Sequence, residues 1–222
     1  MNIETYFPFW SKLDDAQRRK LESAASLSRF ERGAVLHAGS NDCTGLFVVL
    51  NGRLRAYTLS DEGKELTLYR LLDRDICLFS ASCIMRSIEF DIIIAAEEDT
   101  EVLLIPSDVY KELMEQSAAV ANYTSELMGA RFSDVMWLMD QLLNHKLDSR
   151  LAALLLEEHT LDGGETLPIT HERIAAHLGS AREVVTRMLK YFQTEGLVRL
   201  ERGSVTLLDI DRLRELAADS IR

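Results

Sequence analysis

The sequence contains few of the residues that interrupt regular structure, with three prolines and eleven glycines among 222 residues. With 47% hydrophobic and 27% charged residues, this composition excludes a collagen-like or low-complexity chain and is typical of a globular protein. Apolar runs such as residues 92–96 and 151–156 are far shorter than the roughly 20 residues of a membrane-spanning helix. The N-terminal residues lack the basic and apolar regions of a signal peptide, so we expect a cytoplasmic protein.

Cysteine is also scarce, with only Cys43, Cys77 and Cys83. An odd number in a chain of this length argues against a disulfide framework and for thiols in a reducing compartment. Because Cys77 and Cys83 are close in sequence, they are either a redox-sensing pair or two small core residues.

The sequence lacks the motifs of the common enzyme classes: a nucleophile elbow, a Walker loop and a pair of catalytic carboxylates. His171 and Glu172 begin a pattern like that of zinc proteases. That pattern requires a histidine at position 175, where this chain has alanine, and His177 lies outside the spacing. We therefore expect no catalytic residue and no metal site, and we expect that the protein is not an enzyme.

The net charge of −11 opposes binding to a nucleic acid, because phosphate contacts require lysine and arginine. Residues 170–203 are a local exception, in which basic residues outnumber acidic ones. The basic residues of this segment are Arg173, Arg182, Arg187, Lys190, Arg199 and Arg202. A nucleic-acid contact is expected there and not elsewhere in the chain.

Residues 30–106 form a series of short β-type runs separated by turn residues. The runs cover residues 34–37, 45–50, 53–59, 65–72, 91–96 and 101–105. Turn-forming segments, such as residues 51–52 and 61–64, lie between them. Short strands at this spacing, without intervening helices, predict an antiparallel β-barrel or jelly roll.

Residues 107–158 follow helical periodicity, and a seam with alternating steps of three and four residues is typical of a coiled coil. The seam consists of Ala118, Ala121, Ser125, Met128, Phe132, Val135, Met139 and Leu142. A second stripe is expected to pack on the barrel and leave the seam for another subunit; the alternative is that the seam is ordinary core. The second stripe consists of Val120, Tyr123, Leu127 and Leu138. Residues 144–146 interrupt the pattern and mark a candidate hinge.

The C-terminal part is predicted to be a small α/β unit with helices over residues 171–178 and 181–194 and a hairpin over 197–208. Ala175 lies where two helices would touch, and Gly179 follows four residues later at a turn that favours positive φ. Val185, six residues further on, is expected in the core. This spacing indicates a helix-turn-helix, with a plain αα-hairpin as the alternative.

The second helix of this motif has a polar face suited to DNA, on which Arg182, Thr186 and Arg187 are expected to project outward. Such a helix fits the major groove, and an arginine can bond guanine O6 and N7 together. Glu183 has two interpretations: it accepts a hydrogen bond from cytosine N4, or it closes a capping box with Ser180.

These features resemble the Crp/Fnr superfamily of bacterial transcription regulators along nearly the whole chain. Residues 38–40, 46–54 and 61–66 are similar to the barrel of the cyclic-nucleotide-binding fold. The heptad helix is similar to the family's dimerisation helix. Residues 179–187 resemble its recognition helix, which carries the pattern Arg-Glu-x-x-x-Arg.

The resemblance implies an α+β protein in three parts. Residues 1–117 would form an N-terminal helix and an effector barrel, residues 118–145 a dimerisation helix and hinge, and residues 146–222 a winged helix-turn-helix DNA-binding domain. It also implies a homodimer that binds a palindromic operator in double-stranded DNA, with RNA polymerase as a further partner.

The resemblance also assigns roles to individual residues. Arg182, Glu183 and Arg187 fall on base-reading positions, and Thr170 falls on a phosphate-contacting one. The expected DNA-binding residues are Arg182, Glu183, Thr186, Arg187, Thr170, Ser180 and Lys190. The expected dimer interface consists of Met128, Phe132, Val135, Met139 and Leu142.

The chain departs from the family's cyclic AMP binders at the phosphate cassette. Leu78 and Phe79 stand where a Gly-Glu pair belongs, and Phe90 and Asp91 stand where an Arg-Ser pair belongs. An Arg-Ser pair occurs at residues 86–87, which is four residues early. Because a buried phosphate without its arginine costs several kcal/mol, we expect an effector other than cyclic AMP.

Val135 and Met136 replace a Thr-Ser pair that reaches the nucleotide base in the family's cyclic AMP binders. Together with the four cassette positions they define the expected effector pocket, which suits a small apolar molecule or a redox signal read through Cys77 and Cys83. Iron–sulfur sensors of the family use four cysteines, mostly near the N-terminus, and this chain has none before Cys43. The cofactor is left unassigned.

The sequence thus predicts a sequence-specific DNA-binding transcription regulator of the Crp/Fnr type. The alternative is a ligand- or partner-binding barrel whose C-terminal unit serves protein contact only.

Overall fold

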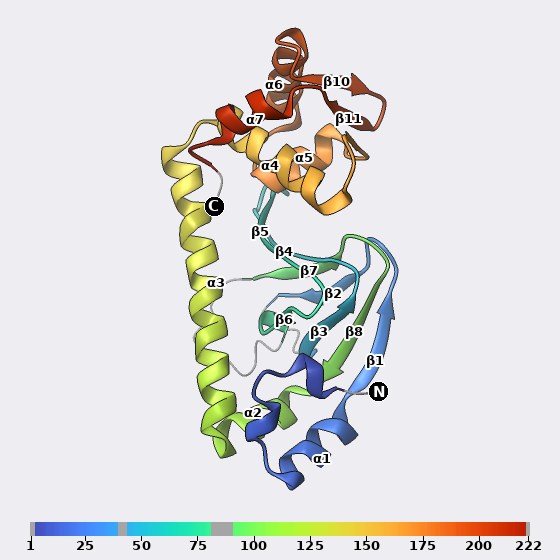
Figure 1. The fold of residues 1–222 in the computed structure, drawn as a ribbon, viewed down its shortest axis with the longest axis vertical. Helices are drawn as coiled ribbons and strands as arrows, with labels where there is room; N and C mark the ends of the chain where they lie inside the picture. The colour runs from blue at the N-terminus through green and yellow to red at the C-terminus, as the bar shows by residue number, and fades with distance from the viewer. Residues whose placement is uncertain (1–2, 40–43, 81–90, 221–222) are drawn as a thin grey trace. The chain divides into compact units, whose positions relative to one another are not determined.

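The structure of the chain is a computed structural model that describes residues 3–39, 44–80 and 91–220 (Figure 1). The chain folds into two compact units. One is formed by Met1–Thr58 with Leu68–Val135, and the other by Leu59–Thr67 with Met136–Arg222.

A roll of two four-stranded sheets dominates the N-terminal half of the chain. One sheet has the order β1-β8-β3-β6, from strands Ser26–Phe30, Thr100–Ile105, Leu46–Asn51 and Ile76–Cys77. The other has the order β2-β7-β4-β5, from strands Val35–Ala38, Ile93–Ala96, Leu54–Leu59 and Glu65–Leu71. This arrangement confirms the α+β class and the jelly roll, although the described strands do not close into a barrel.

Strand β1 was not predicted from the sequence. It pairs antiparallel with β8, from Ser26 opposite Leu104 to Phe30 opposite Thr100. Its residues are mostly exposed or half-buried, because it is an edge strand. A strand that buries so little apolar surface leaves a weak hydrophobic pattern in the sequence.

Alternating side chains of β3 contribute to two separate cores. Leu46 and Val48 lie in a cluster with the N-terminal segment and the helices that follow the roll. Phe47 and Val49 lie in a second cluster, formed with residues of β4 and β7. The period of two in a strand therefore places the sheet of β3 between two apolar layers.

Several helices cover the first of these cores. Two 3-10 helices, Glu4–Tyr6 (η1) and Trp10–Lys12 (η2), precede α1 (Asp15–Ala24), and α2 (Ser107–Gln116) follows β8. Asp14 and Gln17 form a reciprocal capping box at the start of α1. This cap satisfies amide groups that have no partner within the helix.

Helix α3 runs from Ala118 to Asn144 and packs one face against the roll. Val120, Tyr123 and Leu127 join the first core cluster, as predicted for the second apolar stripe. Leu138, the fourth residue of the predicted stripe, is half-buried and does not belong to this cluster. The hydroxyl groups of Tyr110 in α2 and Thr124 in α3 lie 2.8 Å apart, and their hydrogen bond links the two helices. The helix ends at the predicted interruption, and α4 begins at Leu147.

The C-terminal unit is a winged helix-turn-helix. Its helices are α4 (Leu147–Asp162), α5 (His171–Leu178), α6 (Arg182–Thr194) and α7 (Ile210–Ala217). Its sheet has the order β10-β11-β9, from strands Val198–Glu201, Ser204–Leu207 and Thr166–Leu167. The two motif helices and the hairpin confirm the prediction, whereas β9 and α7 were not predicted.

The turn of the motif has the geometry that its sequence indicates. Ala175 is buried in the core of the unit, and Val185 is completely buried. Gly179 ends α5 with a φ of 64°, in the left-handed region that favours glycine. These three positions are as predicted.

Candidate nucleic-acid interface and effector region

The helix-turn-helix begins with a side-chain cap on α5. The Thr170 hydroxyl accepts a hydrogen bond from the Arg173 amide. The second helix starts at Arg182, with Ala181 as its N-cap residue and no side-chain cap. The capping box between Ser180 and Glu183 is therefore wrong, because Ser180 lies one residue before the cap.

Helix α6 separates an apolar face from a polar one. Val185, Leu189 and Phe192 are fully buried in the core of the C-terminal unit. The opposite face carries residues that the sequence predicted to bind DNA. Arg182, Glu183, Arg187 and Lys190 are exposed, and Thr186 is half-buried. The helix can therefore present this row to a partner without losing its core contacts.

Two polar contacts connect α5 to this row. Arg182 Nη1 lies 3.7 Å from Glu172 Oε2, in an exposed ion pair. His171 Nδ1 lies 3.0 Å from the hydroxyl oxygen of Thr186. Burial lowers the pKa of His171, and the positive charges of Arg182 and Lys190 lower it further.

The contact of His171 with Thr186 was not predicted from the sequence. The two residues are fifteen positions apart on different helices, and no periodicity connects them. Among the residues that the structure describes, no group of His, Cys, Asp and Glu could hold a metal ion. His177, the other histidine considered for zinc, is buried and bonds the Thr67 hydroxyl within the same compact unit.

The residues predicted to line an effector pocket differ in their burial. Leu78 and Phe79 are both buried but belong to different core clusters. Asp91 is exposed, and Phe90 lies outside the described residues. On α3, Val135 is half-buried and Met136 is exposed. Residues 83 and 86–87 also lie outside the described part of the chain.

Two arginines that no pattern in the sequence indicates lie in the first unit. Arg55 is buried, and its guanidinium lies 4.3 Å from the ring centroid of Tyr57. Arg131, on α3, lies 4.6 Å from the ring centroid of Tyr69 and 3.0 Å from the Asp134 carboxylate. The periodicity of strands and helices cannot identify such residues, because a periodic pattern predicts apolar side chains, not arginines, at buried positions.

Cys77 lies close to this group, on strand β6, and is buried. Burial raises the pKa of its thiol. A raised pKa keeps the thiol protonated near neutral pH, and the protonated form packs well but reacts slowly. The environment of Cys77 therefore favours a role in packing.

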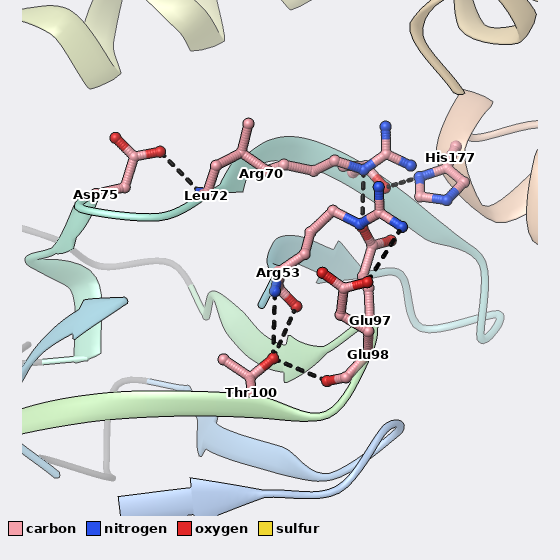
Figure 2. A network of polar contacts seen from close by, with 9 residues as sticks. Arg53, Arg70, Leu72, Asp75, Glu97, Glu98, Thr100 and His177 are labelled. Carbon is pink, nitrogen blue, oxygen red and sulfur yellow. Dashed lines mark hydrogen bonds and ion pairs between the residues drawn. The ribbon is translucent and has the colours of Figure 1, made fainter. Parts of the chain in front are cut away.

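A buried carboxylate lies between two further arginines of the roll (Figure 2). Glu97 Oε2 is 2.8 Å from Arg70 Nε and 3.3 Å from Arg53 Nε. Thr100 accepts a hydrogen bond from the Arg53 amide and donates one to the Glu98 carbonyl. These contacts connect residues of three separate chain segments of the roll.

The C-terminal half of α3 exposes several apolar side chains. Three of them, Phe132, Met139 and Leu142, belong to the predicted seam, and Phe132 is exposed to 68%. The exposed large apolar residues of α3 are Phe132, Met136, Trp137, Met139, Leu142 and Leu143. Met128 and Val135 differ from the other predicted interface residues, because both are half-buried, Met128 against the roll. No helix within the described ranges is long and apolar enough to cross a membrane.

A β-roll followed by a winged helix-turn-helix with an exposed basic row defines the class of DNA-binding regulators with an effector-type domain. Two family models match the chain. Residues 27–117 match the cyclic nucleotide-binding domain, and residues 149–216 match the Crp-like helix-turn-helix domain.

Individual relatives agree with these matches. A crystal structure from Eubacterium rectale, described as a Crp/Fnr-family transcriptional regulator, has 55% identity and a TM-score of 0.95, covering 96% of this chain and 99% of that one. The transcriptional regulator SdrP of Thermus thermophilus is 32% identical over 76% of this chain and 82% of its own length. The cyclic AMP receptor protein of Thermus thermophilus is 30% identical over 78% of this chain and 79% of its own length.

The chain therefore belongs to the Crp/Fnr family of transcription regulators. It is a DNA-binding regulator and, like its relatives, not an enzyme.

The buried Glu97 gives a test of the roll. Replacing Glu97 with Gln removes the charge that faces Arg53 and Arg70 and leaves them less compensated in a buried environment. We expect Glu97→Gln to lower the free energy of unfolding by about 3 kcal/mol, measured by urea denaturation. Glu62→Gln removes an exposed carboxylate paired with Lys64 and should cause no measurable change. Equal effects of the two substitutions would contradict a structural role for Glu97.

Proposed function

We propose that the chain acts as a homodimer that reads a palindromic operator with one α6 helix in each half-site. The observation that carries the proposal is the exposed polar row of α6, held in place by three fully buried residues on the other side of the helix. In a helix-turn-helix, the second helix enters the major groove and its N-terminal residues contact base edges. Two copies related by a two-fold axis would read half-sites about one helical turn apart.

The polar row of α6 and the residues just before it offer contacts to both the bases and the phosphates of DNA. Arg182, Glu183 and Arg187 are proposed to read bases, because they are exposed within the first two turns of α6. Thr186 lies between them and offers a hydroxyl. Thr170, Ser180 and Lys190 are proposed to contact phosphates. These phosphate contacts would position the helix without adding sequence information.

Replacing Arg182 or Arg187 with Ala tests the base-reading role. We expect each variant to lose about 1–3 kcal/mol of binding free energy on the operator, with preference relaxed at one position per half-site. The operator is first selected from a random duplex library with the wild-type protein. Binding is then measured by fluorescence anisotropy over a range of salt concentrations.

Arg214→Ala is the matched control, because Arg214 is an exposed arginine on α7 in the same unit. It should change operator affinity little. Equal losses on operator and random DNA for Arg182→Ala or Arg187→Ala would show that these residues contact only phosphate. Failure of the wild type to bind any duplex would favour a C-terminal unit used for protein contact.

The exposed apolar side chains of α3 support the homodimer. A monomer seldom exposes a large apolar patch, and three of these side chains, Phe132, Met139 and Leu142, follow the seam of a coiled coil. We propose that Phe132, Met139 and Leu142 pack against the same residues of a second copy, with Val135 and Met128 at the edge of the contact.

The proposed division of the chain is an effector domain (residues 1–117), a dimerisation helix with its hinge (residues 118–145) and a DNA-binding domain (residues 146–222). RNA polymerase is a proposed partner, and the protein would act in the cytoplasm, where bacterial DNA lies.

Phe132→Glu tests this interface, because it would place two like charges across the two-fold axis. We expect a monomer by light scattering and a loss of operator binding. The control is Ala130→Glu, which adds the same charge at an exposed position outside the seam. A Phe132→Glu protein that remains dimeric would place the interface elsewhere.

We further propose that the effector is not cyclic AMP, even though one relative is named a cyclic AMP receptor protein. Leu78 and Phe79 are used as core residues at the cassette positions. Two arginines of this unit that could attract a phosphate already have partners. Arg131 pairs with Asp134 and stacks on Tyr69. Arg55 stacks on Tyr57 and has further partners. A cyclic phosphate would have to compete with these contacts.

Calorimetric titration with cyclic AMP tests this proposal. We expect a dissociation constant of about 1 mM or weaker, because a phosphate without a dedicated arginine loses its main attraction. The Thermus thermophilus cyclic AMP receptor protein serves as a parallel sample. Micromolar binding that is abolished by Arg86→Ala would contradict the proposal and identify the Arg-Ser pair at residues 86–87 as the phosphate contact.

A further inference from the structure

His171 and Thr186 join the two helices of the DNA-binding motif at its solvent side. His171 is the first residue of α5, and Thr186 is the fifth residue of α6. Both are half-buried, and Nδ1 of the imidazole lies 3.0 Å from the hydroxyl oxygen. Arg182 and Lys190 lie one helical turn before and after Thr186. The hydroxyl thus lies in the middle of the polar row.

The chemistry of the two groups allows this hydrogen bond in two directions. A hydroxyl has one proton to donate and two lone pairs to accept with. If Nδ1 is unprotonated, Thr186 donates its only proton to His171 and can offer only lone pairs to a third group. If Nδ1 carries a proton, the imidazole donates instead, and the hydroxyl proton is free to point elsewhere.

We propose that His171 is a specificity-determining positioning residue, because it sets whether the Thr186 hydroxyl accepts from or donates to the DNA base that it faces. This inference rests on the proposed reading of DNA by α6. With Nδ1 unprotonated, the hydroxyl favours a base that offers a donor in the major groove, such as cytosine N4. With Nδ1 protonated, it favours an acceptor, such as guanine O6 or thymine O4.

The surroundings of His171 favour the neutral ring near neutral pH. Burial lowers its pKa, and the charged groups that act on it from α6, Arg182 and Lys190, lower it further. Glu172, its neighbour on α5, is paired with Arg182. Acidification therefore converts an accepting Nδ1 into a donating one. The neighbouring phosphates of bound DNA would move this transition to higher pH.

The direction of the hydrogen bond can be measured in the free protein. Long-range ¹⁵N NMR spectra of the imidazole distinguish a protonated from an unprotonated Nδ1. We expect Nδ1 of His171 to be unprotonated at about pH 8 and to gain a proton at a pH below the usual range of histidine. A proton on Nδ1 already at about pH 8 would overturn the inference without affecting the proposal that α6 binds DNA.

The consequence for DNA is measured with operators that carry each of the four base pairs at the position facing Thr186. For the wild type, we expect the ratio of affinities for cytosine over guanine to fall by about 3- to 10-fold between about pH 8 and about pH 5.5, the range of one hydrogen bond. His171→Gln cannot titrate, so its ratio should be independent of pH. Thr186→Val should lose the preference, and Thr186→Ser should keep both the preference and its pH dependence.

His159→Gln is the matched control, because His159 is another histidine of this unit and bonds the Gly164 carbonyl oxygen. It should behave as the wild type does. Denaturation curves for each variant establish that the unit is folded. If the wild type binds the operator but its base preference does not change with pH, or changes equally in His171→Gln, the inference is wrong. If no variant binds DNA, the proposed function fails, and the inference fails with it.

Discussion

The burial of one side of α6 is the constraint on which the proposed DNA-binding surface depends. Val185, Leu189 and Phe192 are enclosed in the C-terminal core, and with 3.6 residues per turn this fixes which side of the helix faces solvent. The charged residues are exposed as a row because no apolar residue interrupts them. Gly179 allows the tight turn that brings α5 against α6, and His171 can then reach Thr186. The packing of the apolar side of α6 thus determines which polar side chains the helix exposes.

In helix α3, as in α6, burial of one side determines which side chains face solvent, but in α3 several of the exposed side chains are apolar. Its stripe of Val120, Tyr123 and Leu127 is covered by the roll, whereas Phe132 and Met139 are not covered by their own chain. A helix with apolar side chains on two faces is stable in water only if both faces find a partner. A second copy of the chain fits this requirement, and it would also provide the second α6 that a palindromic operator needs.

The roll has the family's fold, and we propose that its ligand positions are used differently. Leu78 and Phe79 fill two separate cores, and the guanidinium of Arg131 is occupied by an aromatic ring and a carboxylate. Glu97 holds two further arginines within the roll. Polar groups are therefore present inside this unit and contact one another. The apolar residues at positions 78 and 79 support the proposal that the effector is not cyclic AMP.

The sequence by itself determined the elements that have a clear period or a fixed turn. The heptad of α3, the turn at Gly179 and the strands with continuous apolar runs could all be predicted, because burial of one face imposes a regular spacing. The edge strand β1 and the short strands β6 and β9 could not, since they bury too little apolar surface to leave a pattern.

Contacts between residues far apart in sequence were decided only by the tertiary structure. The pair of His171 with Thr186 and the arginines around Glu97 depend on how separate elements approach one another. Propensity and periodicity describe one element at a time, whereas hydrogen bonds between side chains depend on distances of a few ångströms between elements. The sequence therefore determined which helix carries the residues proposed to bind DNA, and the packing of the unit decided which partners those residues have.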